Sequence, residues 1–196
     1  MTEPDLRAVV VAGHTGDAET ARAGLTSLDP GIRAAALGAL ERLDALDPAT
    51  ITTALDDTEV AVRRRAAELA ATHPSVDLLG VLDDPDARVV EVAAWSCGEH
   101  ESRRDEVVER LVDLAGTAED PLVRESAVAA LGAIGDERGL AAIIAACSDK
   151  PAVRRRAVLA LAPFEGAEVE AAIERALVDR DWQVRQAAED LRRAQS

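Results

Sequence analysis

Apolar and polar positions follow a helical period along this chain, and one short sequence motif occurs six times. In its clearest form, an Asp-containing turn precedes an apolar residue and an arginine, and small or apolar residues follow at three, six and seven positions, as from Asp120 to Leu131. We call the arginine position the slot. The slots are Arg33, Arg63, Glu91, Arg124, Arg154 and Arg185, spaced by 30, 28, 33, 30 and 31 residues. A period of this size predicts repeats that bury their apolar faces against their neighbours.

A second amphipathic segment lies between successive slots, so each repeat is predicted to be a helical hairpin. In the fourth repeat, an apolar stripe from Val107 to Leu114 precedes a turn, and Pro121 begins the second helix, where its missing N–H costs nothing. The same plan predicts outer helices near 17–28, 48–55, 75–82, 103–115, 137–147 and 167–178. It predicts inner helices near 30–42, 59–72, 86–98, 121–132, 151–162 and 182–194. The segment from Leu6 to Ala12 is expected to cap the N-terminal end. No linker interrupts the pattern, which indicates one domain over residues 1–196.

The third repeat departs from the pattern because Glu91 stands in its slot. We choose this register because it places Val90, Ala94 and Cys97 on the core face. Trp95 then lies four positions after the slot, between adjacent inner helices. The same position holds Glu189 in the last repeat, and a polar residue there suits a terminal repeat without a further neighbour.

The stretch from Val123 to Asp136 resembles the HEAT-repeat family, and in particular the short HEAT-like repeats named after the phycobilisome lyases. The resemblance covers the whole chain as a repeat and is closest in the fourth and fifth units. It implies an all-α fold, a right-handed α-solenoid of about six helical hairpins with an N-terminal capping helix. It also implies a structural ladder between repeats, with Glu91 as an interruption for which Arg88 could substitute. The ladder residues would be Arg33, Arg63, Arg124, Arg154, Arg185, Asp29, Asp57, Asp120, Asp149 and Asp179.

The charge balance is strongly acidic, with 37 Asp and Glu residues against 22 Lys and Arg residues and a net charge of -15. High salt screens the self-repulsion of such a chain, so this composition is typical of salt-loving microbes. A high-GC genome would also enrich Ala, Arg and Val, but it does not require this acidity, and we therefore favour a halophilic source. The N-terminal residues open no signal peptide, and no apolar run approaches the ~20 residues that span a bilayer. We expect a cytoplasmic protein without membrane contact.

The residue pattern indicates no catalytic, cofactor or metal site. His14, His73 and His100 lie far apart at predicted helix ends or loops, without carboxylates at ligand spacing, and we read them as solvated. Cys97 suits a small core position, and Cys147 lies in a different type of helix, so neither a disulfide nor a metal site is expected. We therefore predict a protein that is not an enzyme.

The inner-helix face that points away from the core is the best candidate for binding. If the core is centred on positions -1, +3, +6 and +7 from the slot, positions +1, +5 and +8 face outward and line the concave groove of a solenoid. Each arginine triplet, 63–65 and 154–156, places one arginine in the ladder and leaves two free. An aromatic residue flanked by arginines is the usual composition of a binding hot spot. Alternatively, the arginines only balance acidic neighbours and Trp95 fills the core. The candidate binding residues are Arg64, Arg65, Trp95, Glu125, Arg155 and Arg156.

Three functions follow from these observations. The first is a protein–protein interaction scaffold or adaptor, a monomer or weak oligomer, in which the arginines grip acidic groups and Trp95 is the apolar anchor. The second is a bilin lyase-like or lyase accessory protein, which the family name implies and which needs a chromophore-sized pocket. The third is nucleic-acid binding, as in HEAT-like DNA glycosylases. The net charge of -15 and the single lysine argue against the third.

Overall fold

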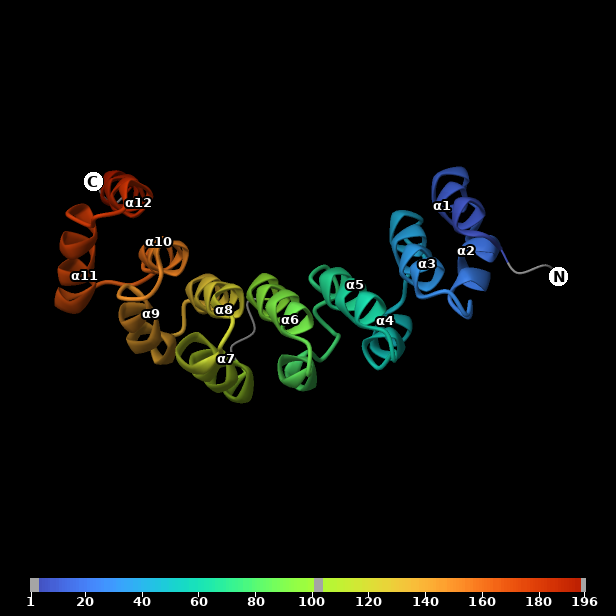
Figure 1. The fold of residues 1–196 in the computed structure, drawn as a ribbon, viewed down its shortest axis with the longest axis horizontal. Coiled ribbons are helices and arrows are strands. Elements are labelled where there is room, and N and C mark those ends of the chain that lie inside the picture. Colours follow the sequence, from blue (N-terminus) through green and yellow to red (C-terminus); the bar gives the residue numbers. More distant parts are fainter. Residues whose placement is uncertain (1–3, 101–103, 195–196) are drawn as a thin grey trace. The chain divides into compact units, whose positions relative to one another are not determined.

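The computed structural model describes residues 4–100 and 104–194, and this part of the chain is helical throughout, without a strand. Twelve α-helices and two short 3-10 helices follow one another in these ranges (Figure 1). The chain divides into two compact units, residues 1–89 and 90–196, and the division falls within α6 (Ala87–Glu99). Each unit consists of stacked helical hairpins, so the predicted all-α repeat fold is confirmed.

The first unit holds an inner and an outer row of helices. α1 packs against α3 and α3 packs against α5, which makes the inner row, while α2 packs on α3 and α4 on α5. α1 therefore covers the end of the row, which is the role expected of a capping helix. The elements are α1 (Leu6–Thr15), α2 (Ala18–Gly24), α3 (Pro30–Arg42), α4 (Pro48–Leu55), α5 (Val60–Ala70) and the 3-10 helix η1 (Leu79–Asp83).

The second unit repeats this plan. α8, α10 and α12 pack in succession as an inner row, and α7, α9 and α11 pack in succession as an outer row. The elements after α6 are α7 (Asp105–Thr117), α8 (Pro121–Ile134), the 3-10 helix η2 (Glu137–Gly139), α9 (Leu140–Ala146), α10 (Pro151–Ala160), α11 (Ala167–Leu177) and α12 (Trp182–Ala194).

Local sequence sets both ends of α8. The carboxylate of Asp120 accepts the N–H of Leu122 at 2.9 Å, which satisfies one of the donors that a helix leaves unpaired at its start. Pro121 follows the cap and has no N–H to satisfy. The helix ends at Gly135, whose φ of 63° lies in the left-handed region that glycine adopts without strain.

The third outer segment differs from the prediction because it forms a short 3-10 helix rather than an α-helix over 75–82. Gly80 lies inside it, and glycine disfavours an α-helix by about 1 kcal/mol relative to alanine. Pro85 follows the segment, and a proline disfavours the α conformation of the residue before it, so an α-helix cannot extend across this position without losing a hydrogen bond. Asp77 caps the remaining turn by accepting the N–H of Leu79 at 3.0 Å.

The third inner helix, α6, has its slot one residue earlier than predicted. Asp86 caps α6 by accepting the N–H of Arg88 at 3.0 Å, in the same way that Asp120 caps α8. The slot of α8, Arg124, lies four residues after its cap, so the equivalent position in α6 is Val90. The preceding residue, Val89, is fully buried, as the valines that precede the other slots are: Val62, Val123, Val153 and Val184.

Close packing between helices supports the same register. A Cβ atom on Gly98 of α6 would lie 2.9 Å from the Cα of Ala130 in α8, and one on Gly132 of α8 would lie 2.6 Å from the Cα of Ala160 in α10. Gly132 lies eight residues after Arg124, and Gly98 lies eight residues after Val90. The two helix pairs therefore meet at equivalent positions.

The corrected register changes which residues of α6 face outward. Val92 and Ser96 lie one and five residues after Glu91, and were therefore predicted to face outward, but both are buried. Glu91 and Trp95 take those positions instead, one and five residues after the slot. The sequence was ambiguous because Val89 and Val90 are both apolar, so either could be read as the core residue before the slot.

Candidate functional site

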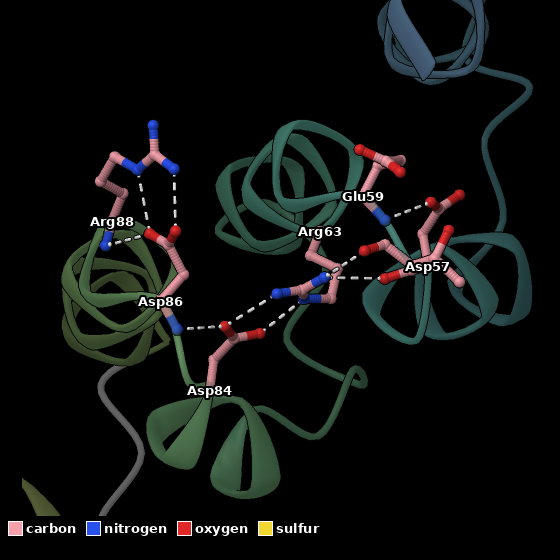
Figure 2. Close-up of polar contacts among 7 residues, drawn as sticks. Asp57, Glu59, Arg63, Asp84, Asp86 and Arg88 are labelled. Carbon is pink, nitrogen blue, oxygen red and sulfur yellow. Dashed lines mark hydrogen bonds and ion pairs between the residues drawn. The ribbon is translucent and has the colours of Figure 1, made fainter. Parts of the chain in front are cut away.

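Slot arginines join successive repeats through paired hydrogen bonds. Figure 2 shows Arg63 between two loops of the first unit: its Nε and Nη2 atoms donate to the carboxylate of Asp84 at 2.7 and 3.0 Å. Its Nη1 donates to the backbone carbonyl of Asp57 at 2.9 Å and to that of Thr58 at 3.1 Å. A bidentate pair of this kind is stronger than a neutral hydrogen bond and also fixes geometry.

Three other slots repeat this arrangement. Nε and Nη2 donate to a carboxylate at 2.7 and 2.7 Å in one pair, 2.6 and 2.8 Å in the second, and 2.9 and 2.7 Å in the third. In each pair, the hydrogen bond from the arginine is the largest cause of a lowered pKa of the aspartate. The same bonds raise the pKa of the arginines above its ordinary value. The pairs are Arg33–Asp57, Arg124–Asp149 and Arg154–Asp179.

The remaining aspartates predicted for the ladder do not pair with slot arginines. Asp29, like Asp120, caps its own helix and accepts the N–H of Gly31 at 2.7 Å. Asp84, which the sequence analysis did not assign to the ladder, is the acceptor of Arg63. Burial alone would raise the pKa of Asp84, but the hydrogen bonds from Arg63 and the Asp86 N–H lower it. The sequence could have identified Asp84, because it lies two residues before the N-cap residue of the next inner helix, as Asp57 and Asp179 do.

The ladder stops at two points. Val90 has no donor in its side chain, so the third repeat contributes no arginine, and Arg88 pairs with Asp86 at 2.8 Å on its own helix instead. In the last repeat, Arg185 donates Nη1 to the carbonyl of Asp179 at 2.7 Å, and this is the only hydrogen bond of its side chain among the described residues. At the other four slots, all three nitrogens of the arginine side chain donate hydrogen bonds within the chain, as the predicted ladder role requires.

The outward face of the second unit contains a pocket of about 450 Å³. α6 and α8 provide its walls, and one arginine of α10 reaches its edge. It lies at the outward positions of the repeats, +1 and +5, and is lined by Glu91, Trp95, Gly98, Glu99, Leu122, Glu125, Ser126, Ala129, Ala130, Ala133 and Arg156. We call these residues the Trp95 pocket.

Two large apolar side chains of the pocket are exposed. Trp95 is 40% exposed and Leu122 is 58% exposed, whereas the inward side chains of α6 and α8 are fully or nearly fully buried. Aromatic and aliphatic groups that remain exposed beside a concave surface are typical of binding sites. Trp95 therefore lies at the surface of the pocket rather than filling the core.

The candidate arginines of the second unit are not free. Arg155 Nη2 lies 4.0 Å from Glu125 Oε1, and Arg156 Nε lies 3.7 Å from the same atom. The Nε atom of Arg156 is buried and has no hydrogen-bond partner in the described structure. Both arginines thus surround Glu125, whose side chain is only 17% exposed, and balance its charge.

The first unit carries the other two candidates. Arg65 Nη1 donates to Glu68 at 2.9 Å within α5, and its Nη2 would lie 2.6 Å from a Cβ atom on Gly38 of α3. The guanidinium of Arg65 therefore covers the glycine of the neighbouring inner helix. Arg64 is exposed.

Other reactive side chains show no site. Cys97 is buried, and burial raises the pKa of the Cys147 thiol to about 11, which disfavours the nucleophilic thiolate. Over residues 4–100 and 104–194, His, Cys, Asp and Glu form no group that could hold a metal ion. His73, expected in solvent, is half-buried, and its Nε2 lies 2.9 Å from Glu41 Oε2. None of the described helices combines the length and apolarity that crossing a bilayer demands.

Comparison with known proteins agrees with the repeat pattern. Residues 75–152 match the family model described as HEAT repeats. A comparison with curated proteins finds no match. Among solved structures, the chain is similar to YibA of Escherichia coli, at 18% identity and a TM-score of 0.70, with 95% of this chain and 74% of that one covered.

Two further structures show the same fold. A designed armadillo repeat protein in complex with the peptide (KR)4 is 20% identical, with a TM-score of 0.60 and coverage of 98% and 100% of the two chains. Human deoxyhypusine hydroxylase in complex with glycerol is 18% identical, with a TM-score of 0.50 and coverage of 95% and 77%. In its repeats and in its α-solenoid fold, this chain resembles the HEAT-repeat family, as the repeated sequence motif predicts.

Proposed function

We propose that the chain is a non-enzymatic protein-binding scaffold that holds its partner on the outward face of α6, α8 and α10. The Trp95 pocket carries this proposal. Trp95 is an exposed tryptophan on α6, at the wall of a pocket of about 450 Å³. Tryptophan is among the residues most enriched at the energetic centres of protein interfaces, where it commonly contributes 2 kcal/mol or more.

The likeness in fold to a designed armadillo protein that was crystallised with a peptide supports a scaffold role. Helical-repeat proteins present extended surfaces on which a partner can touch several repeats. In this chain, the outward positions of α6, α8 and α10 offer such a surface, since Trp95, Ala129 and Leu159 take the same position in three successive repeats. The arginines of α10 then have a supporting role, because they hold Glu125 in place.

Affinity capture with matched tryptophan variants tests the proposal. The immobilised chain is exposed to an extract of the cells that naturally express it, at the ionic strength of those cells, and captured proteins are identified by mass spectrometry. Trp95→Ala should lose the partner. Trp182→Ala is the control, because Trp182 is 65% exposed and lies outside the Trp95 pocket. Retention of the same proteins by Trp95→Ala would exclude this face.

A second variant tests the arginines separately. Joint replacement of Arg64, Arg65, Arg155 and Arg156 by Ser should leave the helical circular dichroism unchanged, since the backbone hydrogen bonds and the ladder remain, although loss of the arginines around Glu125 should lower the melting temperature. Loss of capture in this variant, with capture intact in Trp95→Ala, would assign binding to the arginines rather than to the aromatic pocket.

A further inference from the structure

We infer that the Trp95 pocket receives a cationic side chain, an arginine or lysine of an extended basic segment of the partner protein. This inference rests on the proposed function and names the chemistry of its partner. It reverses the polarity expected from the sequence, in which the arginines of this chain would grip acidic groups.

An acidic–aromatic–acidic stripe along α6 supports the inference. Glu91, Trp95 and Glu99 are spaced by four residues, so they lie above one another on one face of the helix, about 6 Å apart along its axis. All three line the pocket. A cation placed over the indole of Trp95 would therefore have a carboxylate one helical turn away on either side.

The charges that line the pocket favour a cation. Glu125 is balanced by Arg155 and Arg156, at 4.0 and 3.7 Å. Glu91 and Glu99 have no ion pair among the described residues. The pocket is therefore left with a net negative charge, and an acidic side chain entering it would face two uncompensated carboxylates.

The apolar part of the pocket suits the stem of the same side chain. Leu122 and the small residues Ala129 and Ala133 of α8 lie opposite the stripe and line the pocket. Arginine and lysine bury their methylene groups along apolar surfaces while the charged end stays near carboxylates. Tryptophan is the aromatic side chain that attracts a cation most strongly. The pocket thus offers an apolar wall, an aromatic face and two carboxylates to one side chain.

Fluorescence of Trp95 gives a direct test. The variant Trp182→Phe leaves Trp95 as the only tryptophan of the chain. This protein is titrated at 0.15 M salt with a blocked peptide in which arginine alternates with serine. The same peptide with citrulline, which has the shape of arginine without its charge, and with glutamate serve as probes of polarity. We expect the emission of Trp95 to change with the arginine peptide and its Kd to be at least about tenfold lower than that of the citrulline peptide.

A charge-matched pair of variants separates the pocket from the general acidity of the chain. Joint Glu91→Gln and Glu99→Gln should weaken the arginine peptide about tenfold. Joint Glu109→Gln and Glu168→Gln removes the same charge from exposed positions outside the pocket, and binding should stay within about twofold, since charges beyond about 8 Å are screened at this salt. Equal weakening by the two pairs, equal binding of the citrulline peptide, or tighter binding of the glutamate peptide would overturn the inference.

Capture experiments distinguish failure of the cationic-partner inference from failure of the proposed scaffold function. If Trp95→Ala loses the natural partner while joint Glu91→Gln and Glu99→Gln retains it, the scaffold function stands and the cationic partner is wrong. If the arginine peptide binds as expected but Trp95→Ala retains the partner, the pocket binds cations and the partner binds elsewhere.

Discussion

Arg124 and Asp149 lie 25 residues apart and form a bidentate pair, with Nε–Oδ2 at 2.6 Å and Nη2–Oδ1 at 2.8 Å. The third nitrogen, Nη1, donates to the carbonyl of Ala118 at 2.7 Å, in the loop before the same helix. One side chain therefore joins its own loop to the loop of the next repeat. The repeated sequence motif thus provides a side chain that connects adjacent repeats in the stack.

Loss of this link should destabilise the fold. We expect Arg124→Ala to lower the free energy of unfolding by about 1–3 kcal/mol, because Asp149 and the Ala118 carbonyl lose their partner in a partly buried site. Arg64→Ala should change it by no more than ~0.5 kcal/mol, since Arg64 is an exposed residue outside the ladder. Urea denaturation followed by circular dichroism measures both. Equal effects would contradict the structural role of the slot.

The end of the ladder should be weaker than its interior. The side chain of Arg154 makes a bidentate pair with Asp179, whereas the side chain of Arg185 bonds only to the carbonyl of Asp179. Arg154→Ala should therefore cost more stability than Arg185→Ala, by at least about 1 kcal/mol, the worth of hydrogen bonds to a charged group. Denaturation of the two variants under identical conditions makes the comparison. A larger loss in Arg185→Ala would show that the last slot has a role that its contacts do not explain.

Acid should weaken the contribution of the Arg124–Asp149 pair. Arg124 lowers the pKa of Asp149 in the folded chain, while the unfolded value is about 3.9. A group whose folded pKa is depressed stabilises the fold above its unfolded pKa and loses this contribution as pH falls toward the folded pKa. The difference in unfolding free energy between wild type and Asp149→Asn should thus be full at pH 6 and shrink below about pH 4. A difference that stays constant down to pH 3 would contradict this assignment.

Two glycines in the second unit should respond oppositely to alanine. A Cβ atom on Gly132 would lie 2.6 Å from both the Cα and the Cβ of Ala160, so Gly132→Ala must separate α8 from α10. Gly116 has no atom within 4 Å of such a Cβ, and Gly116→Ala should stabilise α7 by roughly 0.4–1 kcal/mol. Overpacking at Gly132 should cost about 1–3 kcal/mol. Thermal melts of the two variants give the signs, and a stabilised Gly132→Ala would refute the close approach.

Salt should stabilise the chain. A net charge of -15 creates self-repulsion that high salt screens, so the melting temperature should rise steadily from 0.1 M to multimolar KCl. Because high salt also strengthens apolar burial, a series of salts at equal ionic strength is needed to separate the two causes. The halophilic source remains a prediction. A melting temperature that does not change with salt would contradict the argument for it.

The sequence alone determined the inner helices and the order of the elements, although the third outer segment is a 3-10 helix rather than the predicted α-helix. Inner helices such as α3 and α8 begin at a capping aspartate and follow an apolar stripe of helical period, and these are local properties that do not depend on distant residues. The predicted inner helix near 121–132 is α8 (Pro121–Ile134), and the predicted segment from Leu6 is α1 (Leu6–Thr15). The arginine at five of the six slots was also visible as a repeat.

Only the tertiary structure decided the register of α6 and the state of the arginines. Two adjacent valines, Val89 and Val90, fit the pattern equally well, and packing of Gly98 against Ala130 selects one of them. The partner of each side chain depends on which residues of the next helix approach it. Arg155 and Arg156 lie against Glu125 and balance its charge. The carboxylates of the pocket that are left without an ion pair among the described residues are Glu91 and Glu99, beside Trp95. Sequence spacing could propose the binding face, but its polarity follows from distances between helices.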